Sequence, residues 1–186
     1  MEGAFIGKEP LFIDEGTVIE PGAYIMGPAY IGKNVSIRHG AYIRENVILL
    51  DDSLVGNSSE VKNSILFPRA HVPHFNYIGD SLLGSNVNLG AGTKLSNLTV
   101  VSEKNKDGKR PTIKLKIDNK EYDTKLAKLG AILGDNVQTG CNSVLNPGCL
   151  VGPNTLIYAN MSLTKGYYPP NKILKLRQTI EIADKF

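Results

Sequence analysis

Aliphatic residues recur at every sixth position over most of the chain. Ten consecutive positions with this spacing are apolar: Ile13, Ile19, Ile25, Ile31, Ile37, Ile43, Leu49, Val55, Val61 and Phe67. A second run covers Leu133, Thr139, Leu145, Val151, Ile157 and Leu163. A period of six fits neither an α-helix nor a simple alternating strand, but it is typical of a solenoid with one short strand and one corner in each hexad. We therefore predict an all-β hexapeptide-repeat solenoid.

The repeat divides the chain into segments of one domain, residues 1–186. We expect hexapeptide coils over 13–98 and 129–166, preceded by an N-terminal cap over 1–12. The C-terminal tail, 167–186, alternates like an extended strand, and a short amphipathic helix is the alternative.

The repeat is irregular in two places. Between Phe67 and Leu83 the inward positions are predicted at Val72 and Ile78, so two hexads have lost a residue around the stretch HVPHFNYIGD. Between residues 99 and 128 the repeat vanishes. There TIKLKI and KEYDT flank Asp118-Asn119, a pair that favours a tight β-turn, and we predict a β-hairpin excursion.

Composition agrees with short strands and many turns, because the chain has 19 Gly, 10 Pro and no Trp. The net charge of +3 is too small to indicate nucleic acid as a partner. The excess lies in the 99–128 excursion, which holds nine Lys plus Arg against five Asp plus Glu. This basic segment could meet the phosphates of a coenzyme, or it is simply a solvated hairpin.

The N-terminal stretch MEGAFIGKEPLF has no basic flank before a long apolar run, and no segment approaches the 18 apolar residues of a membrane span. The two cysteines, Cys141 and Cys149, form neither a disulfide framework nor a zinc-ligand set. We expect a cytoplasmic protein that does not associate with a membrane.

Arg44 and Lys62 are the first candidate binding residues. Each follows an inward residue, and they lie 18 residues apart, so three hexads per turn would stack them on adjacent coils, about 5 Å apart. Two cations at this separation repel each other unless an anion lies in front of them, and a phosphate is the obvious candidate. The alternative is two solvated side chains in register by chance.

His74 is the candidate general base. Glu60, about one coil behind, could orient and polarise its imidazole, and Pro73 stiffens the backbone before it. His71, three residues earlier, is interpreted as structural.

The stretch EVKNSILFPRAHVPHFNYIGDSLLGSNVNLGAGTKLSN carries a specific resemblance. Together with the hexads, it resembles hexapeptide-repeat acyltransferases. In particular, it is similar to the acetyltransferase domain of the bifunctional enzymes that acetylate glucosamine 1-phosphate and then couple the product to UTP, including archaeal sugar-1-phosphate nucleotidylyltransferases. From Arg44 to Asn97 the family pattern aligns without a gap. The resemblance implies a left-handed parallel β-helix, acetyl-CoA as acyl donor, no tightly bound metal, and a homotrimer with sites between neighbours.

The resemblance also implies roles for single residues. In H-x-x-Y-[LI]-G-D, His74 is the catalytic base, supported by Glu60, and Tyr77 lies on the sugar. The Ala91 N–H faces the thioester oxygen. The residues implied for the amino-sugar phosphate are Arg44, Lys62, Tyr77, Asn88 and, from a neighbouring subunit, Lys128. The residues implied for the cofactor are Asn97, Cys141, Ala159 and Arg177; Cys141 stands where members often have Ser, and Arg177 is a loose match.

Two alternatives remain open at the sequence level. One is a zinc β-helix enzyme of the carbonic anhydrase type, using His39, His71 and His74. The other is a non-catalytic module for trimerisation or sugar-nucleotide binding beside a separate nucleotidyltransferase. Coupling to UTP is not expected of this chain, because no nucleotidyltransferase domain precedes the repeat and its only Gly-rich run, LGAGT, lies in hexad register.

Overall fold

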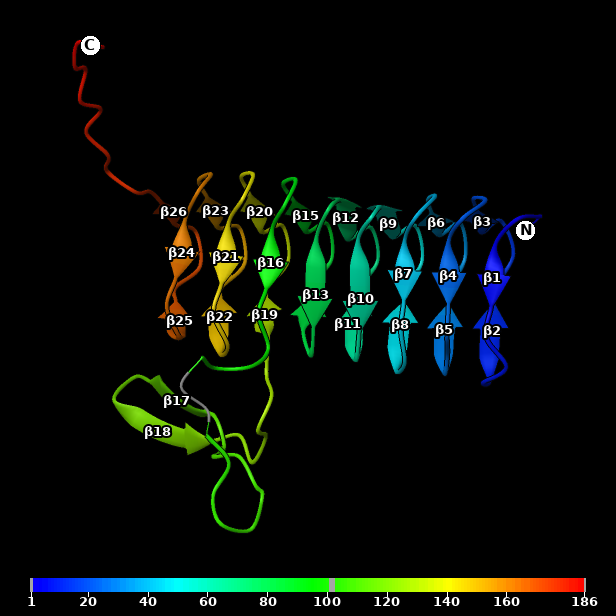
Figure 1. The fold of residues 1–186 in the computed structure, drawn as a ribbon, viewed down its shortest axis with the longest axis horizontal. Helices are drawn as coiled ribbons and strands as arrows, with labels where there is room; N and C mark the ends of the chain where they lie inside the picture. Colours follow the sequence, from blue (N-terminus) through cyan, green and yellow to red (C-terminus); the bar gives the residue numbers. More distant parts are fainter. Residues whose placement is uncertain (1, 101–102, 186) are drawn as a thin grey trace.

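Three parallel sheets run the length of the molecule. The computed structural model describes residues 2–100 and 103–185; Met1, Val101, Ser102 and Phe186, which fall in the predicted cap, excursion and tail, lie outside the described residues. Within the described ranges the chain forms sheets A, B and C, of eight strands each, and one two-stranded sheet. Successive strands pass from A to B to C and back to A, so each complete coil adds one strand to every sheet (Figure 1).

Most strands are two or three residues long. Sheet A contains β1 (Phe5–Ile6), β4 (Tyr24–Ile25), β7 (Tyr42–Ile43), β10 (Glu60–Lys62), β13 (Tyr77–Gly79), β16 (Lys94–Leu95), β21 (Val144–Leu145) and β24 (Ser162–Leu163). Sheet B contains β2 (Leu11–Ile13), β5 (Ala29–Ile31), β8 (Val47–Leu49), β11 (Ser64–Leu66), β14 (Leu82–Leu83), β19 (Ala131–Leu133), β22 (Cys149–Val151) and β25 (Gly166–Tyr168). Sheet C contains β3 (Val18–Ile19), β6 (Ser36–Ile37), β9 (Leu54–Asn57), β12 (His71–His74), β15 (Asn88–Leu89), β20 (Gln138–Thr139), β23 (Leu156–Ile157) and β26 (Ile173–Leu174).

The interior is filled by the residues of the sixfold repeat. Ile25, Ile31, Ile37 and Ile43 are completely buried, and each pairs in register with its counterpart on the next coil. Burial of an aliphatic side chain stabilises a fold by roughly 1.5–3 kcal/mol, so repetition along all three sheets makes these buried rows the main source of stability. The predicted parallel β-helix is confirmed.

The position of the irregular hexads differs from the prediction. Leu66 is fully buried, whereas Phe67 is 41% exposed, so the prediction of an inward Phe67 is wrong. Strand partners lie 18 residues apart up to the Ile43–Val61 pair and 17 apart from the Val47–Ser64 pair to the Ile78–Leu95 pair. After the excursion they are 18 apart again, as in Leu133–Val151. One residue is lost between Val61 and Leu66, not between Phe67 and Val72, and the second is lost between Ile78 and Leu83, as predicted. Apolar character alone could not separate Leu66 from its neighbour Phe67.

The coils reach further toward both ends than the predicted bounds of 13 and 166. At the N-terminus β1 and β2 pair with β4 and β5, and at the C-terminus β25 and β26 pair with β22 and β23. Beyond β26 the described residues to 185 form no regular structure and extend away from the coils (Figure 1). Within the predicted tail, strand pairing is therefore limited to Tyr167–Tyr168 of β25 and Ile173–Leu174 of β26.

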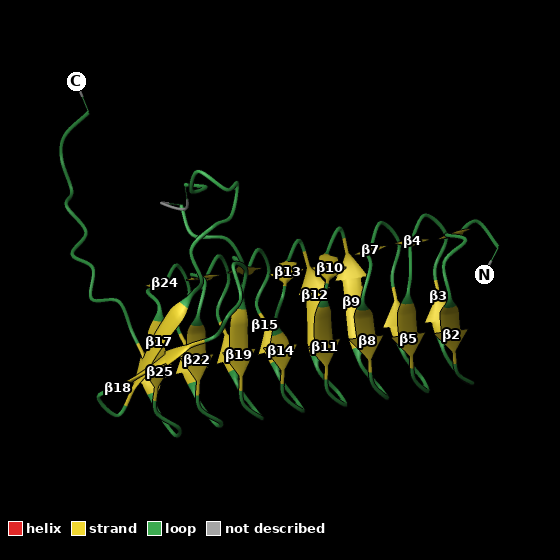
Figure 2. Ribbon diagram, turned by 90° about the horizontal axis from the view of Figure 1, so that it is seen from below, coloured by secondary structure: helices red, strands yellow, loops and turns green. Residues whose placement is uncertain are grey.

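The excursion between β16 and β19 contains the predicted hairpin. β17 (Lys114–Ile117) and β18 (Lys120–Asp123) are antiparallel. Asp118 and Asn119 have φ values of 47° and 63°, as a tight type I′ turn requires. The hairpin lies against β25 (Figure 2), and Leu115 of the hairpin is buried beside Gly148.

Across the described part of the chain there is no helix long and apolar enough to cross a membrane.

The burial pattern makes a stability prediction. Leu66→Ala should lower the free energy of unfolding by about 2–5 kcal/mol, because it leaves a cavity in the core. Phe67→Ala should cost less than about 1.5 kcal/mol, because its ring is partly in solvent. Chemical denaturation of both variants measures the difference. An equal or larger loss for Phe67→Ala would contradict the inward position of Leu66.

Candidate functional site

Most of the predicted site residues gather on sheet A and at its two edges. On each coil the chain turns from sheet C into sheet A at one corner, here called the C/A corner, and from sheet A into sheet B at the next, the A/B corner. Tyr77 begins strand β13 of sheet A. Arg44 and Lys62 lie at the A/B corner, and His74 lies at the C/A corner.

Arg44 and Lys62 are on adjacent coils, as their spacing predicts. Val61 pairs with Ile43, and the Arg44 backbone N–H donates to the Val61 carbonyl at 2.8 Å, which places the two cationic side chains side by side. The Arg44 guanidinium lies over the Tyr42 ring, 5.9 Å from its centroid. Both side chains are partly buried, Lys62 with 17% and Arg44 with 31% of the side chain exposed.

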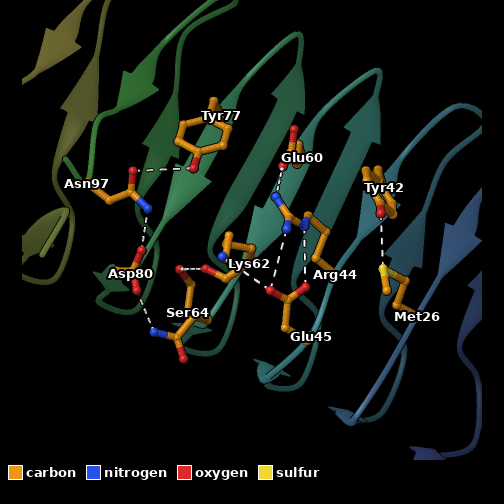
Figure 3. Close-up of polar contacts among 11 residues, drawn as sticks. Met26, Tyr42, Arg44, Glu45, Glu60, Lys62, Ser64, Tyr77, Asp80 and Asn97 are labelled. Carbon is orange, nitrogen blue, oxygen red and sulfur yellow. Dashed lines mark hydrogen bonds and ion pairs between the residues drawn. The ribbon is translucent and has the colours of Figure 1, made fainter. Parts of the chain in front are cut away.

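Glu45, which sequence reasoning missed, lies between these two cations. Its Oε1 is 3.2 Å from Lys62 Nζ and its Oε2 is 3.3 Å from Arg44 Nε (Figure 3). A hydrogen bond from its own backbone N–H and the contact with Lys62 hold the pKa of Glu45 below its ordinary value, so the carboxylate is ionised. The anion expected in front of the two cations is therefore supplied, at least in part, by the chain. The signal was available, since Glu45 directly follows Arg44 at the same corner.

Glu60 is bound to Arg44. Arg44 Nη1 donates to Glu60 Oε1 at 3.0 Å, and this bond raises the pKa of Arg44 (Figure 3). The sequence analysis assigned Glu60 to His74 instead. Support of His74 by Glu60 stays a prediction, and it requires the carboxylate to leave Arg44 or to be shared with it.

A second polar chain runs from Tyr77 to the A/B corner. The Tyr77 hydroxyl donates to Asn97 Oδ1 at 3.4 Å, the Asn97 amide donates to Asp80 Oδ2, and Asn63 donates to Asp80 Oδ1 at 2.6 Å. Burial, followed by the nearby Glu60 carboxylate, raises the pKa of Tyr77, so its phenol stays protonated. Asn97 thus contacts the predicted sugar residue Tyr77, although its predicted role was in cofactor binding.

His74 is presented by an extended strand. In β12 it pairs with Asn57 of β9, and both strands are four residues long. The corner is then closed by Phe75, with φ of 53°, and by buried Asn76, whose Oδ1 accepts from the His74 N–H at 3.0 Å. A side chain at Gly56 would collide with the Pro73 carbonyl, so glycine is needed there for the two strands to approach. The His74 side chain is exposed.

The C/A corner also aligns four of the predicted residues in one row. His74, Ala91, Cys141 and Ala159 occupy this corner on successive coils. Three backbone hydrogen bonds join these coils. Gly92 N–H donates to the His74 carbonyl at 2.9 Å, Asn142 N–H to the Ala91 carbonyl at 2.8 Å, and Asn160 N–H to the Cys141 carbonyl at 2.9 Å. With coils about 4.8 Å apart, the row is about 14 Å long. The proposed base and three predicted cofactor-facing residues are therefore collinear.

The remaining predicted residues are more dispersed. Asn88 lies on β15 in sheet C, between His71 of β12 and Gln138 of β20. Lys128 is exposed and lines a groove of about 480 Å³ with Asn63 and Asp80 of its own chain, next to the A/B corner. Arg177 is exposed in the irregular tail, away from the other residues. Participation of Lys128 in a neighbour's site stays a prediction.

The histidines named for the zinc alternative have other surroundings. His39 Nε2 is 2.9 Å from the Asn57 amide, and His39 Nδ1 is 3.4 Å from Glu20. Within residues 2–100 and 103–185, no group of three or more His, Cys, Asp or Glu is placed to hold a metal ion.

Cys149 and Cys141 differ sharply in environment. Burial raises the pKa of the Cys149 thiol to about 12, whereas Cys141 is exposed at the C/A corner. Only Cys141 is therefore placed to meet a ligand.

Comparison with known proteins gives sequence relatives over nearly the whole chain. The chain is 37% identical over 180 residues to the "Bifunctional protein GlmU" of Methanococcus aeolicus. The aligned segment covers 97% of this chain and 40% of that protein. It is 37% identical over 151 residues to the "Bifunctional sugar-1-phosphate nucleotidylyltransferase/acetyltransferase" of Sulfurisphaera tokodaii, covering 81% of this chain and 36% of the relative. The chain spans two fifths or less of the length of these relatives.

The fold is shared with solved acyltransferase structures. An UDP-N-acetylglucosamine acyltransferase from Arabidopsis superposes with a TM-score of 0.55 at 12% identity, over 91% of this chain and 69% of that one. This likeness shows the fold, and it agrees with the left-handed parallel β-helix that the resemblance implies. The family model described as "GMPPB C-terminal domain" matches residues 7–106. The chain therefore belongs to the GMPPB C-terminal domain family, and it resembles the C-terminal part of GlmU-type bifunctional proteins.

Proposed function

We propose that this chain is an acetyl-CoA-dependent N-acetyltransferase of sugar-nucleotide biosynthesis, acting on an amino-sugar 1-phosphate, with glucosamine 1-phosphate as the preferred substrate. One observation carries the proposal: Arg44 and Lys62 are stacked at one edge of sheet A, with Tyr77 on the same sheet and His74 at its other edge. In the proposed complex, one small molecule with a phosphate and an amine contacts both edges at once. The name of one relative, a bifunctional sugar-1-phosphate nucleotidylyltransferase/acetyltransferase, joins a sugar 1-phosphate with an acetyl transfer and supports the proposal.

In the proposed reaction, Arg44 and Lys62 bind the sugar phosphate and fix the position of the amine, which lowers the entropic part of the barrier. His74 accepts a proton as the amine nitrogen attacks the thioester carbon. The new C–N bond forms, the Ala91 N–H stabilises the oxyanion, and the C–S bond breaks. The thiolate of coenzyme A leaves and takes up the proton.

The acetyl donor is proposed to lie along the C/A corner. The row from His74 through Ala91 and Cys141 to Ala159 is about 14 Å long, which suits an extended chain with its reactive end at His74. Ala91, next to His74 in this row, is suitably placed for the thioester oxygen. Asn97 and Arg177 lie off this row, so in the proposed complex Asn97 contacts the sugar and Arg177 contacts the distal part of the donor.

Sheet B supports the proposed homotrimer. All eight outward side chains of this sheet are apolar: Phe12, Tyr30, Ile48, Ile65, Leu82, Ile132, Leu150 and Tyr167. Five of them are 37–50% exposed, and a continuous apolar face of this kind marks an interaction surface. The A/B corner with Arg44 and Lys62 borders this face. A second copy packed on sheet B would therefore border the site.

The primary test is the release of free thiol from acetyl-CoA. Glucosamine 1-phosphate should give rapid turnover, whereas glucosamine without the phosphate should have a KM at least about tenfold higher, because it lacks the group bound by Arg44 and Lys62. Galactosamine 1-phosphate tests the choice of sugar. No thiol release with any amino-sugar phosphate would contradict the proposal and favour the non-catalytic alternative.

The matched variants for this assay are His74→Ala and His71→Ala. Loss of the base should lower kcat by about 10²–10⁴-fold, whereas His71→Ala, on the same strand, should stay within about twofold. Equal losses in both variants, together with stoichiometric zinc after dialysis, would instead support the metal enzyme.

The row at the C/A corner predicts protection of one thiol. In the folded protein a thiol reagent should modify Cys141 and spare Cys149, because burial raises the Cys149 pKa to about 12 and keeps it protonated. Acetyl-CoA should slow the modification of Cys141 several-fold, and ATP at equal concentration should not. Peptide mapping measures both sites. Unchanged modification of Cys141 at saturating acetyl-CoA would place the donor elsewhere.

The sheet B face predicts an assembly that depends on its apolar residues. Ile65→Lys should convert a trimer to monomers in analytical ultracentrifugation, because a charge would be buried in the interface. Val18→Lys, on an outward position of sheet C that is 60% exposed, is the matched control and should leave the trimer intact. A wild-type monomer, or a trimer unaffected by Ile65→Lys, would rule out this interface.

A further inference from the structure

Glu45 has contacts that suggest more than a structural ion pair. One carboxylate reaches both predicted phosphate ligands, Lys62 Nζ at 3.2 Å and Arg44 Nε at 3.3 Å, and Arg44 Nη2 at 3.5 Å. It therefore occupies a bridging position between the two cations (Figure 3). An incoming anion that contacts Arg44 and Lys62 together must share or take over that position.

The local charge is balanced before any ligand is considered. Arg44 and Lys62 carry two positive charges, and Glu45 and Glu60, both in contact with them, carry two negative charges. Asp80 adds another carboxylate one coil further along. An approaching anion thus meets no net positive charge, unlike in a site made of two unpaired cations.

Arg44 nevertheless keeps an unused donor. Its Nε is buried and makes no hydrogen bond within the described residues, since the 3.3 Å contact with Glu45 lacks hydrogen-bond geometry. A buried N–H without an acceptor is costly. A ligand oxygen at this position would satisfy it better than Glu45 does, which gives a reason for an exchange of one anion for another.

We propose that Glu45 is a specificity-determining residue: its carboxylate competes with the ligand's anionic group for Arg44 and Lys62, and so sets the charge that a ligand must carry to bind. The inference rests on the proposed function, because it concerns the same phosphate site. A monoanion, such as a carboxylate or a phosphodiester, only replaces one negative charge with another. A phosphate monoester carries close to two negative charges above its second pKa of about 6, and it can outcompete Glu45.

The competing explanation is that Glu45 merely holds the two cations in position. The two roles have opposite consequences when the charge is removed. If Glu45 competes with the ligand, Glu45→Gln raises the affinity for anions. If Glu45 only positions Arg44 and Lys62, the same variant lowers it, because the cations become less ordered.

The experiment is isothermal titration of the purified full chain with inorganic phosphate and, separately, with acetate, at about pH 8, where phosphate is a dianion. Wild-type protein should bind phosphate and show no measurable binding of acetate. Glu45→Gln should bind phosphate about tenfold more tightly, a change of about 1.4 kcal/mol, and should bind acetate measurably. Glu45→Asp keeps the charge and should behave like the wild type.

Two controls identify the site and exclude a general charge effect. Arg44→Ala should abolish phosphate binding in the wild-type and Glu45→Gln backgrounds. Glu15→Gln, which breaks an exposed pair with Lys33 at 2.7 Å on another corner, should change nothing. Thermal unfolding checks that each variant is folded.

The outcomes separate this inference from the proposed function. If wild-type protein binds phosphate through Arg44 and Glu45→Gln binds it equally or more weakly, the role of Glu45 is wrong and the phosphate site stands. If neither protein binds phosphate, both the phosphate site and the inference are wrong. Tighter phosphate binding with newly measurable acetate binding supports the role of Glu45.

Discussion

The structure depends on one constraint. In a narrow three-sided prism, the strands of all three sheets must fill the interior with mainly aliphatic side chains, while the backbone of each coil stays paired with the coils beside it. The fully buried residues of the sixfold repeat meet this constraint. Because the pairing is parallel and in register, any side chain one residue from an inward position is stacked on its counterpart one coil away. The scaffold thereby converts sequence spacing into spatial proximity, which is how residues as distant as Arg44 and Asn97 come to lie on one sheet.

The same constraint explains how a site can be built without disturbing the core. The coils shorten from 18 to 17 residues after Val61, yet the inward row continues through Leu66, Val72 and Ile78, each with no exposed area. The change is absorbed at the A/B corner, where Asn63 and Asp80, both with positive φ, close the shortened turns. This corner carries Asn63 and Asp80 next to the cations, whereas the hexad of His74, from Val72 to Ile78, keeps its six residues. Variation at the corners is therefore compatible with a regular interior.

The fold could be predicted from the sequence because the sixfold repeat marks the residues that must lie in the interior. The hairpin could be predicted because Asp118-Asn119 has the backbone preference of a tight turn. It misplaced Phe67, because two adjacent apolar residues satisfy the pattern equally well and only packing selects Leu66. It predicted the stacking of Arg44 and Lys62 from spacing but missed Glu45. Glu60 was assigned to His74, but in the structure it binds Arg44. Long side chains on neighbouring coils have several partners within reach, and strand register alone does not choose among them.

The central claim is that the two edges of sheet A bind opposite ends of one amino-sugar phosphate. A crystal structure of the protein with glucosamine 1-phosphate and coenzyme A tests it most directly. The account predicts the phosphate in contact with Arg44 and Lys62, with Glu45 displaced or shared, and the amine facing His74 with the coenzyme along the row to Ala159. A phosphate bound away from Arg44 and Lys62, or an amine facing away from His74, would contradict it.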